Sequence, residues 1–291
     1  MSTESTSIPV QTSSLPAATS LRELVIEPRP GWIAINWHEL WEARELLYFL
    51  VLRDVKVRYK QTVLGVAWAV LQPVFTMLVF TIIFGQFAKI PSDGLPYSIF
   101  VFAGLLPWTF FSSNISQASM SLMNQQSLLT KIYLPRLFIP ASAVGSGLVD
   151  LFVSFVVFGA LMLYYGVPVG VGALALPFLV ALTAAASLGV GLILAAVTVT
   201  YRDFRYVVPF LIQSWMYLSP VIYPVSMVPD KWQPLLALNP MAGIIDAFRS
   251  ALFGLPWNVT TLCVSSASAL VLLGYGLFYF RKTERVFADV A

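Results

Sequence analysis

Long apolar runs separated by short polar stretches dominate the pattern of hydrophobic and polar positions along this chain. A run of about 20 apolar residues is long enough to cross the hydrocarbon core of a bilayer as a helix. The runs of that kind are Leu64–Phe87, Tyr97–Met120, Phe138–Leu163, Leu174–Thr200, Tyr206–Tyr223 and Thr260–Phe280. The pattern therefore predicts an all-α integral membrane protein with six transmembrane helices, in a single membrane domain over residues 64–280.

The fifth run is the shortest, and it leads into the prolines of Ser219–Pro224. Proline breaks a regular helix, so we expect the end of this run not to be helical. The stretch Pro224–Asn258 that follows contains Ala242–Leu252, which is helix-like but too short to cross. Apolar segments of about 10–14 residues are typical of re-entrant or interfacial helices. We therefore predict short re-entrant helices joined near Asn239-Pro240, which serve either as a structural cap or as pore lining.

Before the first run, Trp37–Val63 interleaves charged residues with large apolar ones. This pattern predicts an amphipathic helix at the membrane interface. Its basic side chains would either meet anionic lipid or offer a docking platform to a soluble partner. Residues 1–36 begin with a stretch rich in Ser and Thr, and we expect a disordered or loosely ordered tail there. Residues 281–291 form the predicted C-terminal tail.

The composition agrees with a membrane protein, because 58% of residues are hydrophobic and 11% are charged. A soluble domain carries about 25% charged residues. In such a chain the net charge of +3 gives no indication of nucleic acid binding. Cys263 and His38 are the sole residues of their types, so no disulfide framework and no Cys/His metal cluster can form. We predict no metal site.

Lys and Arg are distributed unequally between the two sides of the predicted bundle. If both termini face the cytoplasm, 14 of the 17 basic residues are cytoplasmic, and Lys89, Lys231 and Arg249 lie outside. An excess of basic residues marks the cytoplasmic loops of membrane proteins. The distribution therefore predicts a multi-pass protein with both termini in the cytoplasm.

Five motifs occur in order between about Trp37 and Phe280. They are Leu52–Trp68 continued by Leu71-Gln72-Pro73, Leu106-Pro107-Trp108, Tyr201–Arg205, Ser219–Pro224 and Leu238-Asn239-Pro240-Met241. Together they resemble the motifs of ABC-2 type permeases. The resemblance is to the polysaccharide-exporting branch, which comprises the membrane subunits for O-antigen, capsule and teichoic acid.

This resemblance implies a homodimer in the bacterial cytoplasmic (inner) membrane, resting on two copies of a separate nucleotide-binding subunit. That partner would bind ATP and Mg, and this chain would bind no cofactor itself. The sequence agrees, because it contains no Gly-x-x-x-x-Gly-Lys-Ser/Thr phosphate loop. The cargo would be a lipid-linked polysaccharide. An ABC-2 exporter of a drug or another small hydrophobic cargo is the alternative.

Charged residues in three predicted cytoplasmic segments are candidates for contact with the ATPase. They are Arg53, Asp54, Lys56 and Arg58 before the first run, Lys131 and Arg136 after the second, and Arg202 and Asp203 after the fourth. The segment after the second run is similar to a coupling or gate helix of the family. For Arg202 and Asp203 the alternative is a local ion pair that contributes little energy.

Aromatic residues make up 14% of the chain and are candidates for contact with sugars. Tyr and Trp combine an apolar ring with a polar tip, so they can hold a sugar face while its hydroxyls stay hydrated. The candidates for channel lining or gating are Trp108, Phe110, Phe111, Trp215, Tyr217, Tyr223, Asn239 and Pro240. The alternative for Trp and Tyr is the aromatic belt at the membrane interface.

Asp150 lies inside the third run with no basic neighbour in sequence. An ionisable residue at such a position faces an aqueous cavity or a partner, or takes part in a hydrogen bond within the bundle. A membrane enzyme is a further alternative for the whole chain, but such chemistry usually needs paired carboxylates or a metal. The outer loops offer Asp93, Asp230 and Asp246, widely separated in sequence. The sequence therefore favours a permease without catalytic residues, and leaves the glycan and its lipid carrier open.

Overall fold

The computed structural model describes residues 37–60, 65–125 and 134–284, all within one unit that spans Ile35–Ala291. In chain order the helices are α1 (Trp37–Glu42), α2 (Arg44–Lys60), α3 (Gly65–Phe80), η1 (Thr81–Phe87), α4 (Tyr97–Asn124), α6 (Phe138–Tyr165), η2 (Val171–Ala175), α7 (Leu176–Thr200), α8 (Phe204–Leu218), η3 (Val225–Met227), η4 (Asp230–Trp232), α9 (Gln233–Ala237), α10 (Pro240–Phe253) and α11 (Val259–Thr283). These described residues contain helices and turns but no strand, as the sequence predicts.

Five stretches of helix are long and apolar enough to cross a membrane. They are Ala67–Phe87, Tyr97–Asn124, Phe138–Tyr165, Val171–Thr200 and Val259–Thr283, which coincide with five of the six predicted runs. A sixth candidate is the pair formed by residues 230–237 and Pro240–Phe253, counted as one span. The prediction of an all-α integral membrane protein with several spans is confirmed.

The fifth predicted run, Tyr206–Tyr223, is the exception. Its helix α8 has 15 residues, which corresponds to about 22 Å, whereas the hydrocarbon core is about 30 Å thick. Ser219 ends the helix with extended backbone, and the chain then turns irregularly toward Pro224. The prolines thus end the helix before the end of the run, as predicted, and α8 alone is shorter than a full span.

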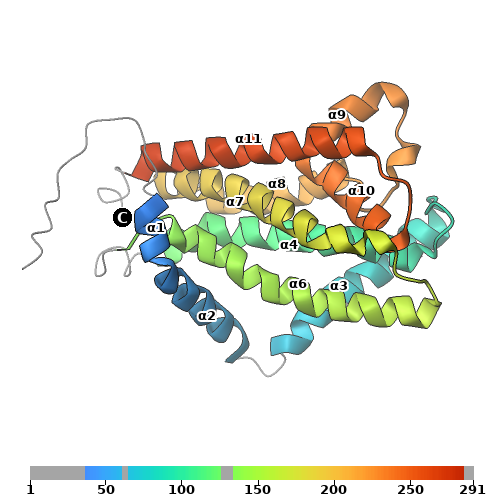
Figure 1. The fold of residues 1–291 in the computed structure, drawn as a ribbon, viewed down its shortest axis with the longest axis horizontal. Helices are drawn as coiled ribbons and strands as arrows, with labels where there is room; N and C mark the ends of the chain where they lie inside the picture. Colours follow the sequence, from blue (N-terminus) through green and yellow to red (C-terminus); the bar gives the residue numbers. More distant parts are fainter. Residues whose placement is uncertain (1–36, 61–64, 126–133, 285–291) are drawn as a thin grey trace, which may run out of the picture. The chain divides into compact units, whose positions relative to one another are not determined.

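Helix α4 forms the centre of the bundle. Apart from the half-buried Thr109, every residue from Ser98 to Phe111 is buried. Helix α4 packs against α6, α7 and α10, and α7 packs in turn against α11 (Figure 1). Small residues bring the last pair into backbone contact, because a Cβ atom on Gly189 would meet the backbone of Leu272 at 2.6 Å.

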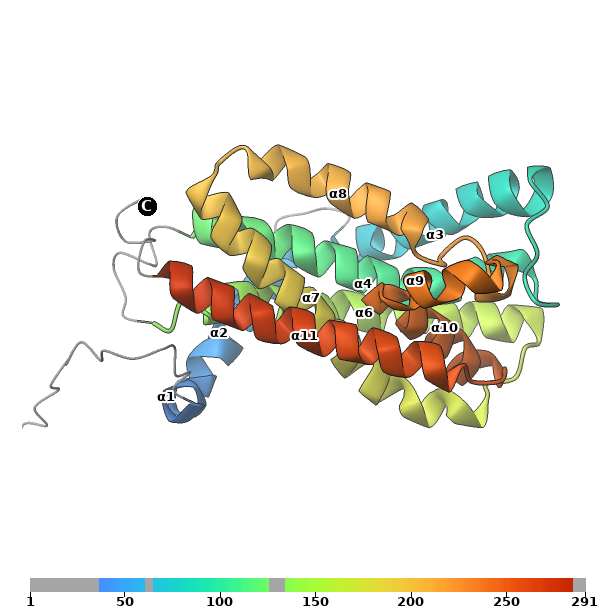
Figure 2. The same ribbon diagram turned by 90° about the horizontal axis from the view of Figure 1, so that it is seen from above.

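Helices α1 and α2 lie at one end of the bundle, and α9 and α10 lie at the other (Figures 1 and 2). Helix α2 packs on α6, where Val51 fits against Gly145 and Leu50 is buried. Leu46–Leu52 are apolar and most of its charges follow in Arg53–Lys60, so its polarity changes mainly along its length. Exposed Tyr48 and Phe49 belong to the apolar half. Placement of this helix at a membrane surface stays a prediction.

The short helices between α8 and α11 form where the sequence predicts them. Helices α9 and α10 meet at Asn239-Pro240, and the two parts of this segment are bent by 103° relative to each other. The Asn239 side chain accepts a hydrogen bond from the Met241 amide and caps α10, and Pro240 occupies the first turn. Gly254, with φ of 68°, ends the helix. Re-entry of this pair into a membrane stays a prediction.

Candidate functional site

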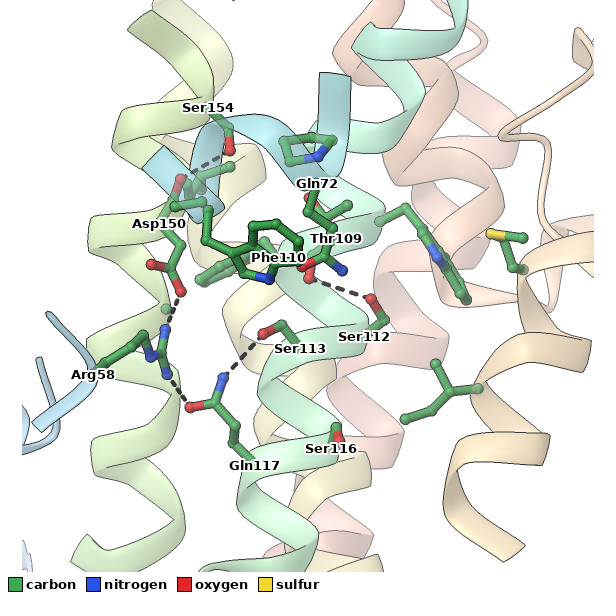
Figure 3. Close-up of a pocket in the computed structure, with 18 of the residues that line it drawn as sticks. Arg58, Gln72, Thr109, Phe110, Ser112, Ser113, Ser116, Gln117, Asp150 and Ser154 are labelled. Atoms are coloured by element: carbon green, nitrogen blue, oxygen red, sulfur yellow. Dashed lines mark hydrogen bonds and ion pairs between the residues drawn. The ribbon is translucent and has the colours of Figure 1, made fainter. Parts of the chain in front are cut away.

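A cavity of about 1110 Å³ lies among α3, α4, α6, α8 and the end of α2. Its polar lining includes Gln72, Thr109, Ser112, Ser113, Ser116, Gln117, Ser154 and Gln213. Its aromatic lining comprises Tyr59, Trp68, Trp108 and Phe110. Hydroxyl, amide and aromatic groups therefore line one cavity inside a largely apolar bundle, as Figure 3 shows in close-up.

The polar wall arises from the helical repeat of α4. Thr109, Ser112, Ser113, Ser116 and Gln117 are spaced three or four residues apart, which places them on one side of a helix. Figure 3 shows several of these side chains directed toward the same space. This stripe is a helical pattern within an apolar run, and the length of the run alone does not reveal it.

An ion pair joins α2 to α6 at the edge of this cavity. Arg58 Nη1 contacts Asp150 Oδ2, and Arg58 Nη2 donates to Gln117 Oε1 of α4 (Figure 3). Gln117 Nε2 donates in turn to Ser113 Oγ at 2.9 Å. Side chains that are 92 residues apart in the sequence therefore bind each other, and they connect three helices.

Tyr59 completes this group, because its hydroxyl donates to the other carboxylate oxygen of Asp150. Burial, followed by the hydrogen bond to Asp150 and its negative charge, raises the pKa of the Tyr59 phenol to about 12. The phenol therefore stays protonated at neutral pH and keeps donating. Asp150, whose role the sequence left open, has Arg58 as its charged partner and also lines the cavity.

A second cavity of about 590 Å³ lies on the side of α2 and is lined by Arg53, Asp54 and Asn124 among others. Arg58 and Gln117 line both cavities. Arg53 pairs with Asp54 at 2.7 Å. Asp54 also accepts a hydrogen bond from Ser142 of α6, likewise at 2.7 Å. Each of the two cavities thus contains an arginine paired with an aspartate.

A different arginine organises the opposite end of the bundle. Arg249 of α10 is 2% exposed, and its guanidinium lies 3.7 Å from the centroid of the Phe100 ring. It donates to the carbonyl oxygens of Pro220 and Val221, each at 2.7 Å, and more weakly to that of Tyr223 at 3.4 Å. It also reaches the Phe100 carbonyl at 3.3 Å. One buried side chain therefore supplies the donors that this irregular segment lacks.

The remaining carbonyl groups of the segment 218–223 also have donors. They pair as Asn239 Nδ2 with Leu218 at 3.3 Å, the Val221 amide with Ser219 at 2.7 Å, and Tyr97 Oη with Ile222 at 2.7 Å. Irregular backbone inside a membrane protein needs partners from the protein itself. Side chains of α4 and α10 provide most of them here, so the segment is fixed although it is not helical.

Asn239 also reaches the aromatic residues behind the cavity. Its Oδ1 accepts from Trp215 Nε1 at 3.0 Å. The Trp215 ring meets Phe111 edge-on, with centroids 5.2 Å apart, and Phe111 lies 5.7 Å from Trp108. An aromatic row therefore connects the cavity wall to the start of α10.

The structure divides the predicted channel residues into two groups. Trp108 and Phe110 line the cavity of about 1110 Å³. The others are not part of its lining: Phe111, Trp215, Tyr217, Tyr223, Asn239 and Pro240. Phe111 and Pro240 are buried, and Tyr217 is exposed on α8. Their part in a channel stays a prediction.

The predicted ATPase-coupling residues also fall into two groups. Arg53, Asp54 and Arg58 form the contacts described above, and Arg136 donates to the Glu284 carbonyl oxygen at 2.5 Å. Lys56, Arg202 and Asp203 are exposed. Lys131 lies outside the described residues. No ion pair joins Arg202 to Asp203 where the structure describes them, so the local-pair alternative gains no support.

Within residues 37–60, 65–125 and 134–284, no three His, Cys, Asp or Glu side chains gather where a metal ion could bind. The cavity therefore offers hydrogen bonds and ring faces, not metal ligands. A bundle of apolar helices around a polar, aromatic-edged cavity is the arrangement of a membrane permease.

Comparison with known proteins identifies the family. The sequence model of the ABC-2 type transporter family matches residues 45–253. The chain belongs to the ABC-2 type transporter family, as the motifs predict.

Several relatives match over most of their length. The chain is 31% identical to the O-antigen export system permease protein RfbA of Myxococcus xanthus over 255 residues, 86% of this chain and 97% of that protein. It is 25% identical to RfbA of Klebsiella pneumoniae over 84% of this chain and 95% of the relative. It is 26% identical to the polysialic acid transport protein KpsM of Escherichia coli, over 81% and 92% respectively.

Proposed function

We propose that this chain is the membrane-spanning, channel-forming subunit of an ATP-driven ABC transporter that exports a lipid-linked polysaccharide. The cavity of about 1110 Å³ carries the proposal, because its hydroxyl, amide and aromatic lining suits a hydrated sugar chain. The relatives named for O-antigen export and polysialic acid transport support the same class of cargo. They leave open whether the polymer is neutral or acidic.

The active unit in this proposal is a homodimer with two copies of a separate ATPase. The cavity is lined by one side of the bundle, and a second copy facing it would close a channel between them. The ATPase would bind ATP and Mg, because the chain has no phosphate loop. Exposed Lys56, Arg202 and Asp203 are the residues best placed to receive it.

The proposed topology is multi-pass in the bacterial cytoplasmic membrane, with six spans and both termini cytoplasmic. Helix α8 with Ser219–Tyr223 would form the fifth span, and α9 with α10 would re-enter from the outer side. The distribution of Lys and Arg supports this orientation. Single cysteines introduced at Asp230 and Arg202, after Cys263→Ser, test it in intact cells. A membrane-impermeant maleimide should label the first position and not the second, and the reverse result would overturn the orientation.

Export of a drug or another small hydrophobic cargo is the alternative, and the relatives named for polysaccharide export do not favour it. A transport assay in proteoliposomes separates the two functions. The chain is reconstituted with its proposed ATPase subunit, and ATP-dependent movement of a lipid-linked glycan is measured against that of a hydrophobic dye. Glycan export is the expected result. Dye export without glycan export would overturn the proposal.

The docking role is tested by charge reversal on the exposed turn after α7. Arg202→Glu should weaken co-purification with the ATPase and reduce glycan-dependent ATP hydrolysis. Lys231→Glu, in η4 directly before α9, serves as the control, because α9 lies at the opposite end of the bundle (Figure 1). Equal co-purification of both variants with the ATPase would remove Arg202 from the interface.

A further inference from the structure

We propose that the cavity is built for an uncharged polymer, and that the Arg58–Asp150 pair sets this preference by cancelling the charge of the wall. The inference rests on the proposed function, because it concerns the cargo of that same cavity. It goes further in naming one class of polysaccharide, neutral chains rather than polyanions. Asp150 and Arg58 become residues that determine specificity.

The charges along the cavity carry the first step of the argument. Among the described residues that line it, the ionisable side chains are Arg58, Tyr59 and Asp150. Arg58 and Asp150 form an ion pair, so their charges cancel. The Tyr59 hydroxyl donates a hydrogen bond to Asp150, keeps its proton and is uncharged. This lining therefore carries no net charge.

The second cavity repeats the same arrangement. Arg53 and Asp54 line it and pair at 2.7 Å, and Arg58 stands between the two cavities. Each arginine that a passing chain would meet in these cavities is thus already bound to a carboxylate. The polar groups left to contact cargo are neutral: Gln72, Ser112, Ser116 and Gln213 are examples.

Physical chemistry makes such a lining selective. A neutral sugar chain leaving water can exchange its hydrogen bonds for those of hydroxyl and amide side chains at little net cost. A polymer with a carboxylate in each repeat would bring charges into apolar surroundings without fixed positive charges to bind them. Arg58 does not supply such a charge, because Asp150 already binds it. Discrimination therefore comes from an unfavourable contact as well as from favourable ones.

The experiment uses the full chain with its ATPase in proteoliposomes and two lipid-linked glycans. They share the lipid carrier, the length and the terminal sugar, and differ in one carboxylate per repeat. We expect the initial export rate of the neutral glycan to exceed that of the acidic one by about tenfold. Equal rates would overturn the inference and leave the proposed function standing. Export of neither glycan by an assembled, ATP-hydrolysing complex would overturn the proposed function itself.

Variants then test whether the ion pair sets the preference. Asp150→Asn leaves Arg58 without its carboxylate, so it should raise the export of the acidic glycan relative to the neutral one. Arg58→Gln combined with Asp150→Asn makes the wall neutral again and should restore the original ratio. Asp230→Asn, which removes a carboxylate outside both cavity linings, should leave the ratio unchanged. If assembled Asp150→Asn protein exported the two glycans in the wild-type ratio, the inference would be wrong. The comparison of the two glycans with wild-type protein tests the inference even if a variant does not fold.

Discussion

Arg58 and Arg249 solve the same problem, a guanidinium inside an apolar bundle, in two different ways. The Arg58 side chain is 28% exposed, borders two cavities and binds a carboxylate. Arg249 is 2% exposed, and its four hydrogen-bond acceptors are backbone carbonyl oxygens. In an ion pair beside a cavity, a charged side chain can exchange its partner for water or for cargo. A guanidinium enclosed by carbonyl groups cannot be removed without leaving buried polar atoms unpaired.

The comparison separates residues that serve transport from residues that serve the fold. Removing one partner of an ion pair that is a quarter exposed leaves a charge which water in the cavity can still reach. Removing Arg249 leaves several buried acceptors with nothing to replace the donors. We therefore expect changes at Arg249 to affect assembly, and changes at Arg58 or Asp150 to affect what the protein carries.

The largest effect is expected for Arg249→Met. It removes the donors to the carbonyl groups of Pro220, Val221 and Tyr223, and each buried unpaired group costs about 1–3 kcal/mol. Their sum is comparable with a total stability of about 5–15 kcal/mol. Size-exclusion chromatography in detergent should show little monodisperse protein.

Arg249→Lys sharpens this prediction, because it keeps the positive charge but lacks the planar set of five donors. We expect a yield between those of wild type and Arg249→Met. If Arg249→Met gave wild-type yield and an unchanged melting temperature, the carbonyl contacts would contribute nothing measurable.

A smaller loss of stability is expected for Gly104→Ala on α4. Its new Cβ atom would lie 2.6 Å from Arg249 Nη2 and 3.1 Å from the Val221 carbonyl oxygen. Overpacking of this kind costs about 1–3 kcal/mol. Gly159→Ala on α6 is the matched control, because nothing lies within 4 Å of its added atom. In a helix interior that change should stabilise by about 0.5–1 kcal/mol. Thermal unfolding followed by tryptophan fluorescence compares the two, and equal melting temperatures would argue against the tight fit.

The Arg58–Asp150 ion pair is expected to contribute less to stability than the contacts of Arg249. In a double-mutant cycle with Arg58→Gln and Asp150→Asn, we expect a coupling energy of about 1 kcal/mol, because both side chains are partly exposed. The cycle is measured from the unfolding of the four proteins in detergent. A coupling above about 3 kcal/mol would contradict the contrast with Arg249.

An effect of the same size is expected for Tyr59→Phe, which removes one hydrogen bond to Asp150 and should cost about 1 kcal/mol. The folded-state pKa of about 12 lies above the ordinary value of 10.0. The stabilisation by the protonated phenol is therefore complete below pH 10 and is lost as the pH rises through about 12. The difference between wild type and variant should stay constant near neutral pH. If the stability difference between wild type and Tyr59→Phe shrank between pH 6 and pH 9, the raised pKa of Tyr59 would be refuted.

Sequence patterns predict the elements of this fold well, because span length and basic loops depend on local properties. The apolar runs coincide with α4, α6, α7 and α11 to within a few residues. The motifs gave the family, and the prolines of Ser219–Pro224 gave the end of α8. The last residues of the fifth run are apolar without being helical, which hydropathy does not show and the prolines do.

The contacts that define the site were beyond prediction for a physical reason. Arg58 and Asp150 are 92 residues apart, and Arg249 and Phe100 are 149 apart, so only the packing of helices brings them together. Counting charges placed Arg249 among the outer loop residues, whereas it is buried. The polar stripe from Thr109 to Gln117 was open to prediction, since its spacing of three and four residues is visible in the sequence.

The contacts of Asn239 have a mechanical consequence. This one side chain holds the end of α8, through Leu218, Ser219 and Trp215, and the first turn of α10. The opposite end of α8 follows the exposed turn of Arg202 and Asp203. Among the described residues, side-chain hydrogen bonds therefore tie helix α8 to Asn239 at this end, while buried Val208 packs the other half of the helix. A push on that turn would be passed along α8 to Asn239, and from there to the first turn of α10.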